Sequence, residues 1–171
     1  MTLQSVHSTQ LSQVLIAFGG AILGGLFALV GGLIQGKRDQ RQRTREMSQS
    51  ASKRILMSLA ELEGAIVEGV ALKQLDGIRS SFNNFSLITT SEAPFITDNE
   101  LISRIRNHIE LMYGLVSVAA QGAVFIADAA RKHSGMVTES LEAHIRKDQL
   151  PPYKKPPLRN AAELLAWATE G

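Results

Sequence analysis

Histidine, the residue type in this chain best suited to metal binding and proton transfer, occurs at four positions. These are His7, His108, His133 and His144. None has a second histidine or a cysteine three or four residues away, the spacing that places two metal ligands on one helix face. The sequence therefore predicts four separate surface histidines and no metal site.

Motifs for nucleotide binding and nucleophilic catalysis are also absent from the sequence. It contains no G-x-x-x-x-G-K-[ST] loop, no G-x-S-x-G motif and no cysteine. Asp128 lies beside an apolar run, but Lys132, four residues later, offers it an ion pair. We therefore expect no enzymatic activity and no cofactor.

The longest apolar stretch runs from Leu11 to Gly36 and contains no Asp, Glu, Lys, Arg or His. As a helix it would be ~39 Å long, against ~30 Å for the hydrocarbon core of a bilayer. A signal peptide would begin with basic residues and have a shorter apolar core, whereas residues 1–10 contain no Lys or Arg. The sequence predicts one transmembrane helix over residues 11–36.

Basic residues follow the predicted span directly, at Lys37, Arg38, Arg41, Arg43 and Arg45. Because positive charge is retained on the cytoplasmic side, residues 1–10 are predicted outside and the C-terminal part in the cytoplasm. The same five residues are expected to contact anionic headgroups at the membrane surface. The formal net charge of +2 is too small to indicate nucleic-acid binding.

Small residues recur every fourth position in the predicted span. The stripe consists of Gly20, Gly24, Ala28, Gly32 and Gly36. A stripe of this kind lets another helix approach closely in lipid, so we expect a homo-oligomer formed through this helix. A second stripe, at alternating spacings of four and three, comprises Ala17, Ala21, Gly24, Ala28 and Gly31. The first stripe would favour a right-handed crossing of two helices and the second a left-handed one.

The remainder of the chain is predicted to be helical, with a basic juxtamembrane helix at residues 37–50 and a cytoplasmic hairpin or bundle at residues 51–148. An apolar stripe of helical period supports this and comprises Ile55, Leu59, Leu62, Ile66 and Val70. Asp76-Gly77 is expected to end that helix. Residues 78–96 are rich in Ser, Thr and Asn and are compatible with a loop, a short helix or a recognition surface.

Thr97 and Glu100 have the spacing of a capping box and predict the start of a further helix. The uncharged run at residues 111–127 is expected to form a central, largely buried helix, with a second membrane span as the alternative. Gly135 is expected to end or kink that helix, and residues 136–148 to add a further helical stretch.

Residues 149–171 are predicted to form a Pro-rich linker and a short C-terminal helix that begins at a second capping box, Asn160 to Glu163. Two alternatives stay open for this segment. Its basic and aromatic residues would suit the membrane surface, and the competing interpretation is a solvated, disordered tail.

Together these patterns predict an all-α, single-pass, self-associating membrane protein that acts as a scaffold for cytoplasmic protein partners. A channel-like effector that permeabilises the bilayer is one alternative, although no polar residue lies between Val14 and Ile34. A subunit of a larger membrane complex is the other.

Overall fold

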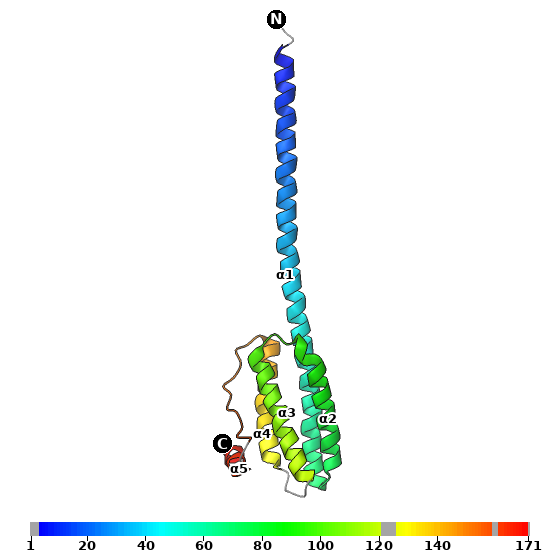
Figure 1. Ribbon diagram of the computed structural model, residues 1–171, viewed down its shortest axis with the longest axis vertical. Helices are drawn as coiled ribbons and strands as arrows, with labels where there is room; N and C mark the ends of the chain where they lie inside the picture. Colours follow the sequence, from blue (N-terminus) through cyan, green and yellow to red (C-terminus); the bar gives the residue numbers. More distant parts are fainter. Residues whose placement is uncertain (1–3, 121–125, 159–160, 171) are drawn as a thin grey trace. The chain divides into compact units, whose positions relative to one another are not determined.

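A computed structural model describes the backbone of residues 4–120, 126–158 and 161–170, and their side chains from Gln35 onward except Ala161. Regular structure in these ranges is entirely helical, which confirms the predicted all-α class (Figure 1). The elements are α1 (Gln4–Leu72), α2 (Leu75–Glu92), the 3-10 helix η1 (Ala93–Phe95), α3 (Asn99–Ala120), α4 (Ala127–Arg146) and α5 (Ala161–Thr169).

Within the described residues, no helix has both the length and the apolar character needed to cross a bilayer. The predicted span at residues 11–36 lies almost entirely outside the residues whose side chains are described. That span therefore stays a prediction.

The chain divides into two compact units, Met1–Thr44 and Arg45–Gly171. In the first unit the chain is helical from Gln4, and the described side chains from Gln35 to Arg43 are all exposed. The second unit contains the rest of α1, helices α2 to α5 and the described hydrophobic core.

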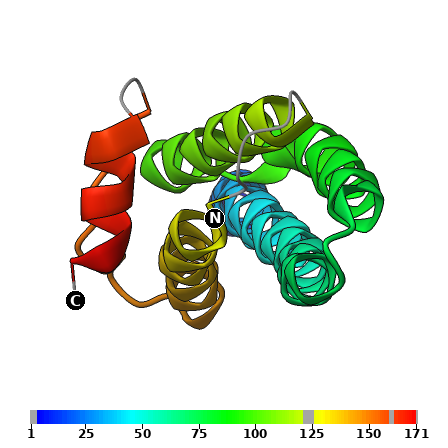
Figure 2. The same cartoon turned by 90° about the horizontal axis from the view of Figure 1, so that it is seen from below.

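The second unit contains a bundle in which α1, α2, α3 and α4 run in alternating directions (Figures 1 and 2). Contacts between α1 and α2 show this for the first pair: Arg54 with Glu92, Glu61 with Asn84, and Gly69 beside Ile78. As the residue number on α1 rises, that on α2 falls, so the two helices are antiparallel. The short helix α5 lies against α4, on the outer side of the bundle.

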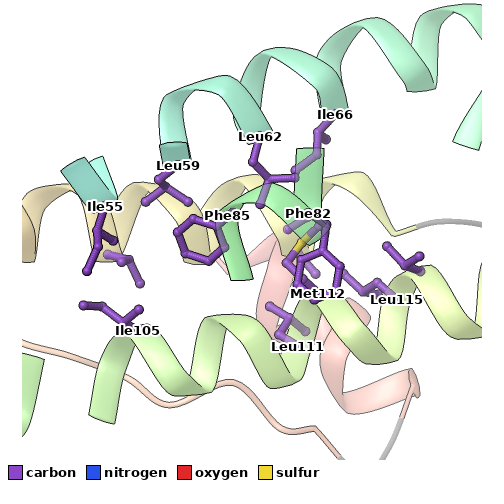
Figure 3. Packing of buried hydrophobic residues seen from close by; sticks show 14 of the residues in the cluster. Ile55, Leu59, Leu62, Ile66, Phe82, Phe85, Ile105, Leu111, Met112 and Leu115 are labelled. Atoms are coloured by element: carbon purple, nitrogen blue, oxygen red, sulfur yellow. The ribbon is translucent and has the colours of Figure 1, made fainter. Parts of the chain in front are cut away.

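Large aliphatic side chains of α1 form one wall of the core (Figure 3). Ile55, Leu59, Leu62 and Ile66 are each 0% exposed, as the apolar stripe predicted. The stripe fails at Val70, which is 40% exposed. Gly69 takes the inward position at this level, and the absence of a side chain there lets Ile78 of α2 pack against the α1 backbone.

The predicted helix end at Asp76-Gly77 is wrong. Helix α1 ends at Leu72, and Lys73 after it adopts the left-handed conformation with φ of 56°. Asp76 and Gly77 lie instead in the first turn of α2, where an acidic side chain is favourable. The segment at residues 78–96, which the sequence left open, forms most of α2 and η1 and buries Phe82 and Phe85.

The capping box was predicted one residue too early. Asp98, not Thr97, caps α3, since its Oδ1 accepts hydrogen bonds from the backbone N–H groups of Glu100 (2.9 Å) and Leu101 (3.1 Å). The Glu100 side chain pairs with Arg104 instead of reaching back along the chain. Helix α5 is present as expected, whereas its predicted cap, Asn160, lies outside the described residues.

The uncharged run at residues 111–127 belongs to two helices, because α3 ends at Ala120 and α4 begins at Ala127. Leu111, Met112 and Leu115 are buried in the core, as expected for a central helix. Helix α3 as described is not long and apolar enough to cross a bilayer, and residues 121–125 of the run lie outside the described residues. Helix α4 continues through Gly135, so a helix end at that residue is wrong, and the alternative of a kink there stays a prediction.

Candidate functional site

The residues predicted to mediate helix packing in lipid lie mostly beyond the described side chains. Gly20, Gly24, Ala28 and Gly32 are outside them. Gly36 is described: it is exposed, and a Cβ added there would meet no atom within 4 Å. This one position therefore leaves room for a second helix.

The residues predicted at the membrane surface are all described. Lys37, Arg38, Arg41, Arg43 and Arg45 are each exposed on α1. Their guanidinium and ammonium groups thus remain accessible to an anionic surface.

The histidines differ from the prediction of four separate surface side chains. His108 on α3 and His133 on α4 are both 0% exposed and face each other across the two helices. Their rings are parallel within 2°, with centroids 5.2 Å apart, and their Nδ1 atoms lie 3.0 Å apart. His144 is partly buried and lies 3.0 Å from Ser48 Oγ, while His7 is outside the described side chains.

A short hydrogen-bonded chain extends from this pair to the C-terminal segment. Tyr153 Oη lies 2.9 Å from His133 Nε2 and 2.9 Å from Asn107 Nδ2. The donor and acceptor roles along this chain are mutually consistent in one arrangement. Asn107 donates to Tyr153, Tyr153 donates to His133 Nε2, and His133 donates from Nδ1 to His108. Tyr153 thus ties the segment after α4 to both α3 and α4.

Arg104 adds a buried charge beside this chain. Only 3% of the residue is exposed, and its guanidinium donates to Ser140 Oγ at 2.8 Å and pairs with Glu100. Its Cζ also lies 5.0 Å from the centre of the Tyr153 ring, a cation–π geometry. Arg104 therefore holds α3, α4 and the C-terminal segment together.

Both buried histidines are neutral near pH 7. Burial and, to a smaller extent, the neighbouring His133 lower the pKa of His108 to about 3. Burial alone lowers the pKa of His133 to about 4. Near pH 7 the pair therefore acts as a hydrogen-bonding unit and not as a cation.

Trp167 of α5 makes the second attachment of the C-terminal segment. It is 3% exposed, its ring centroid lies 6.1 Å from that of His133, and Lys132 Nζ is 5.0 Å from its ring centre. Lys132 also donates to the backbone carbonyls of Trp167 (2.6 Å) and Glu170, at the end of α5. The ion pair predicted between Asp128 and Lys132 is wrong, because Asp128 pairs with Arg131.

The structure does not support a solvated, disordered tail for the C-terminal segment, whereas contact of the segment's basic residues with a membrane surface stays a prediction. Tyr153 and Trp167 pack on the bundle and are occupied there, neither free in solvent nor directed to a lipid surface. We call the group formed by Arg104, Asn107, His108, His133 and Tyr153 the histidine latch.

The latch is suited to fastening the C-terminal segment and poorly suited to metal chemistry. Two histidines alone make an incomplete metal site, and the described residues contain no group of three or more His, Cys, Asp or Glu placed to hold a metal ion. The adjacent Arg104 would also repel a cation.

The sequence contained a signal for the burial of the two histidines, although not for their pairing. His108 continues the inward stripe of α3, in which Leu101, Ile105, His108, Met112 and Leu115 alternate in spacing between four and three. On α4, His133 lies on the inward stripe with Val137 and Leu141, at spacings of four. A search for metal-ligand spacing along one helix misses such a pair, because its members come from different helices.

Comparison with known proteins finds no matching family, no similar curated protein and no similar solved structure. The functional interpretation therefore depends on the chain's own residues.

Proposed function

We propose that this chain is a single-pass membrane protein that self-associates through residues 11–36 and holds its helical bundle on the cytoplasmic side as a scaffold for protein partners. The observation that carries the proposal is the uncharged run from Leu11 to Gly36, followed at once by five basic residues. The exposure of those basic residues on α1 supports a role at the membrane surface.

The second unit supports a scaffold more than an enzyme. Its most unusual polar group, the histidine latch, is occupied by contacts within the chain and fastens the C-terminal segment. A catalytic histidine near neutral pH would need a pKa close to 7, whereas burial lowers those of His108 and His133 to about 3 and about 4. We therefore propose that the bundle binds partners and has no catalytic activity of its own.

Cross-linking in membranes tests self-association. Lys37 follows the glycine stripe by one residue and offers an amine for the cross-linker. We expect the wild-type chain to cross-link to itself and the double variant Gly24→Ile, Ala28→Ile to lose this product, because added side chains keep two helices apart. The variant Leu26→Phe, Leu33→Phe adds bulk on the opposite face and should still cross-link. Equal cross-linking of the stripe variant and the wild type would contradict the proposal.

A membrane-permeabilising effector is the second candidate, because glycine-striped helices can pack into rings. Dye leakage from vesicles that carry the purified chain distinguishes the two. The scaffold proposal expects tight vesicles, since the predicted span has no polar face to line a wet pore. Leakage that disappears in the stripe variant would favour the effector.

A further inference from the structure

An open groove lies between the end of α2 and the first half of α3, with a volume of about 410 Å³. Its walls are mainly aliphatic: Ile102, Ile105 and Ile109 from α3, and Ala93 and Pro94 from the turn after α2. We call it the α2–α3 groove. Its size is at the lower end of the range of about 300–1,000 Å³ typical of small-ligand sites.

Two polar residues of the α2–α3 groove have groups without partners. Arg106 is exposed and makes no ion pair or hydrogen bond within the described part of the chain. Thr89 is only 5% exposed, and its hydroxyl has no hydrogen-bond partner among the described residues. The neighbouring Thr90 shows the usual alternative, since its hydroxyl donates to the Ser86 carbonyl at 2.8 Å.

We propose that the α2–α3 groove binds a short linear alkyl carboxylate, with its chain along the isoleucines and its carboxylate paired with Arg106. The isoleucine side chains offer apolar surface to the alkyl chain. Arg106 offers a planar, permanently charged partner whose donors match the two oxygens of a carboxylate. Thr89, whose buried hydroxyl lacks a partner among the described residues, is a second polar residue of this mainly apolar site.

An extended peptide fits this groove less well. Peptides bound in extended form usually gain affinity from main-chain hydrogen bonds. Most of the groove wall belongs to α2 and α3, whose backbone groups are used within the helices, and Pro94 has no backbone N–H to donate. The groove therefore recognises a ligand by apolar contact and charge, as an alkyl carboxylate requires.

The test uses the full chain in phosphatidylcholine nanodiscs with ¹³C-labelled isoleucine methyl groups, titrated with octanoate. We expect saturable shifts of the Ile102, Ile105 and Ile109 methyl signals, while that of the core residue Ile55 stays in place. Octanol has the same chain without the charge and should bind about threefold to fivefold more weakly, the range of one exposed ion pair. Nanodiscs without protein correct for octanoate that enters the lipid.

Variants separate charge from packing. Arg106→Gln should weaken octanoate binding about threefold to fivefold, and Arg106→Lys should restore part of the loss. Ile109→Trp should fill the groove and abolish binding, with an unchanged Ile55 signal to show that the bundle is folded. Arg79→Gln is the matched control, because Arg79 is an exposed arginine of α2 that lines a different groove.

Three results would overturn the proposal: octanol binding as tightly as octanoate, unchanged binding by Ile109→Trp, or shifts that never saturate. Each is independent of the proposed membrane function, because every residue of the groove lies between Thr89 and Ile109, within the second unit.

Discussion

Two helices of the same bundle, α1 after Arg45 and α4, bury very different side chains. The inward face of α1 carries the large aliphatic residues Ile55, Leu59, Leu62 and Ile66, with Ala51 and three buried serines beside them. The inward face of α4 is mostly small or polar, with Ala129, Ala130, His133, Ser134 and Ser140 beside two larger aliphatic residues, Val137 and Leu141. Burial of apolar surface thus stabilises the α1 side of the bundle, whereas directional hydrogen bonds contribute much more on the α4 side.

The difference explains how the C-terminal segment is held. Small side chains on α4 leave room for the rings of His108 and Tyr153 and for the guanidinium of Arg104. Apolar packing tolerates many arrangements, but a chain of hydrogen bonds has one correct geometry. We infer that α1 supplies much of the stability of the bundle and that α4 specifies where residues 149–170 pack.

A fall in pH should reveal the largest difference between the α1 side and the α4 side of the bundle. His108 and His133 titrate near 6.5 in the unfolded chain, but burial holds their pKa values at about 3 and about 4 in the folded chain. Below pH 6.5 the unfolded chain therefore binds more protons, and stability falls as the pH falls. We expect the free energy of unfolding to drop by about 2 kcal/mol per histidine between pH 7 and pH 5.

Urea denaturation at a series of pH values measures this loss. His133→Gln removes one titrating group, so its loss between pH 7 and pH 5 should be about 2 kcal/mol smaller than that of the wild type. Identical pH dependence in the two proteins would show that the latch does not titrate as described.

On the apolar side, Leu59→Ala should cost about 3 kcal/mol of unfolding free energy, because it removes a fully buried side chain and leaves a cavity. This loss should be the same at pH 6 and pH 8, since no titrating group is changed. Met57→Ala, two residues earlier and 67% exposed, is the matched control and should cost less than about 0.5 kcal/mol. A loss at Leu59 that depends on pH would break the division between the two sides.

Tyr153→Phe tests the latch with almost no change of shape. Loss of the hydroxyl leaves Asn107 Nδ2 and His133 Nε2 without their shared partner, at a cost of about 2 kcal/mol. Amide exchange in α5 should become faster than in α1, because the segment loses one of its two attachments. Tyr113→Phe, at a tyrosine that is 69% exposed, should leave both measurements unchanged. Uniform acceleration across the bundle would mean that Tyr153 stabilises the whole fold and not the segment.

The smallest effects are expected at two glycines of α1. A Cβ at Gly69 would lie 2.6 Å from Ile78 Cγ1 and 2.7 Å from the Gln74 carbonyl oxygen, so Gly69→Ala should destabilise the bundle by about 1 kcal/mol or more. Gly64 has open space, and Gly64→Ala should stabilise it by up to about 1 kcal/mol through helix propensity. Thermal unfolding of the two variants measures the direction of both changes in stability. A Gly69→Ala variant as stable as the wild type would contradict the close packing of α1 on α2.

Helix content and the apolar face of α1 could be predicted from the sequence because they follow from local periodicity, as Ile55, Leu59, Leu62 and Ile66 show. Helix ends were less predictable. Asp98 and Thr97 are both good caps, and Lys73 takes a left-handed conformation more typical of glycine, so residue type alone did not determine either end.

The histidine latch could not be predicted, because it joins residues up to 46 positions apart along the chain through hydrogen bonds, from Asn107 and His108 through His133 to Tyr153. A lone histidine on an amphipathic helix has the same local sequence whether it is solvated or meets a partner. The inward register of His108 and His133 indicated burial, but the antiparallel pairing of α3 and α4 was needed to bring the two together.

Topology in intact cells tests the central claim most directly, and a chain without cysteine is well suited to it. We would place a single cysteine by Ser8→Cys, before the predicted span, or by Met57→Cys, on the exposed face of α1, and label with a membrane-impermeant maleimide. If residues 11–36 cross the bilayer, the cysteine at position 8 is labelled from outside. The cysteine at position 57 is then labelled only after the cells are permeabilised. Equal labelling of both, or recovery of the full chain in the supernatant without detergent, would contradict the claim.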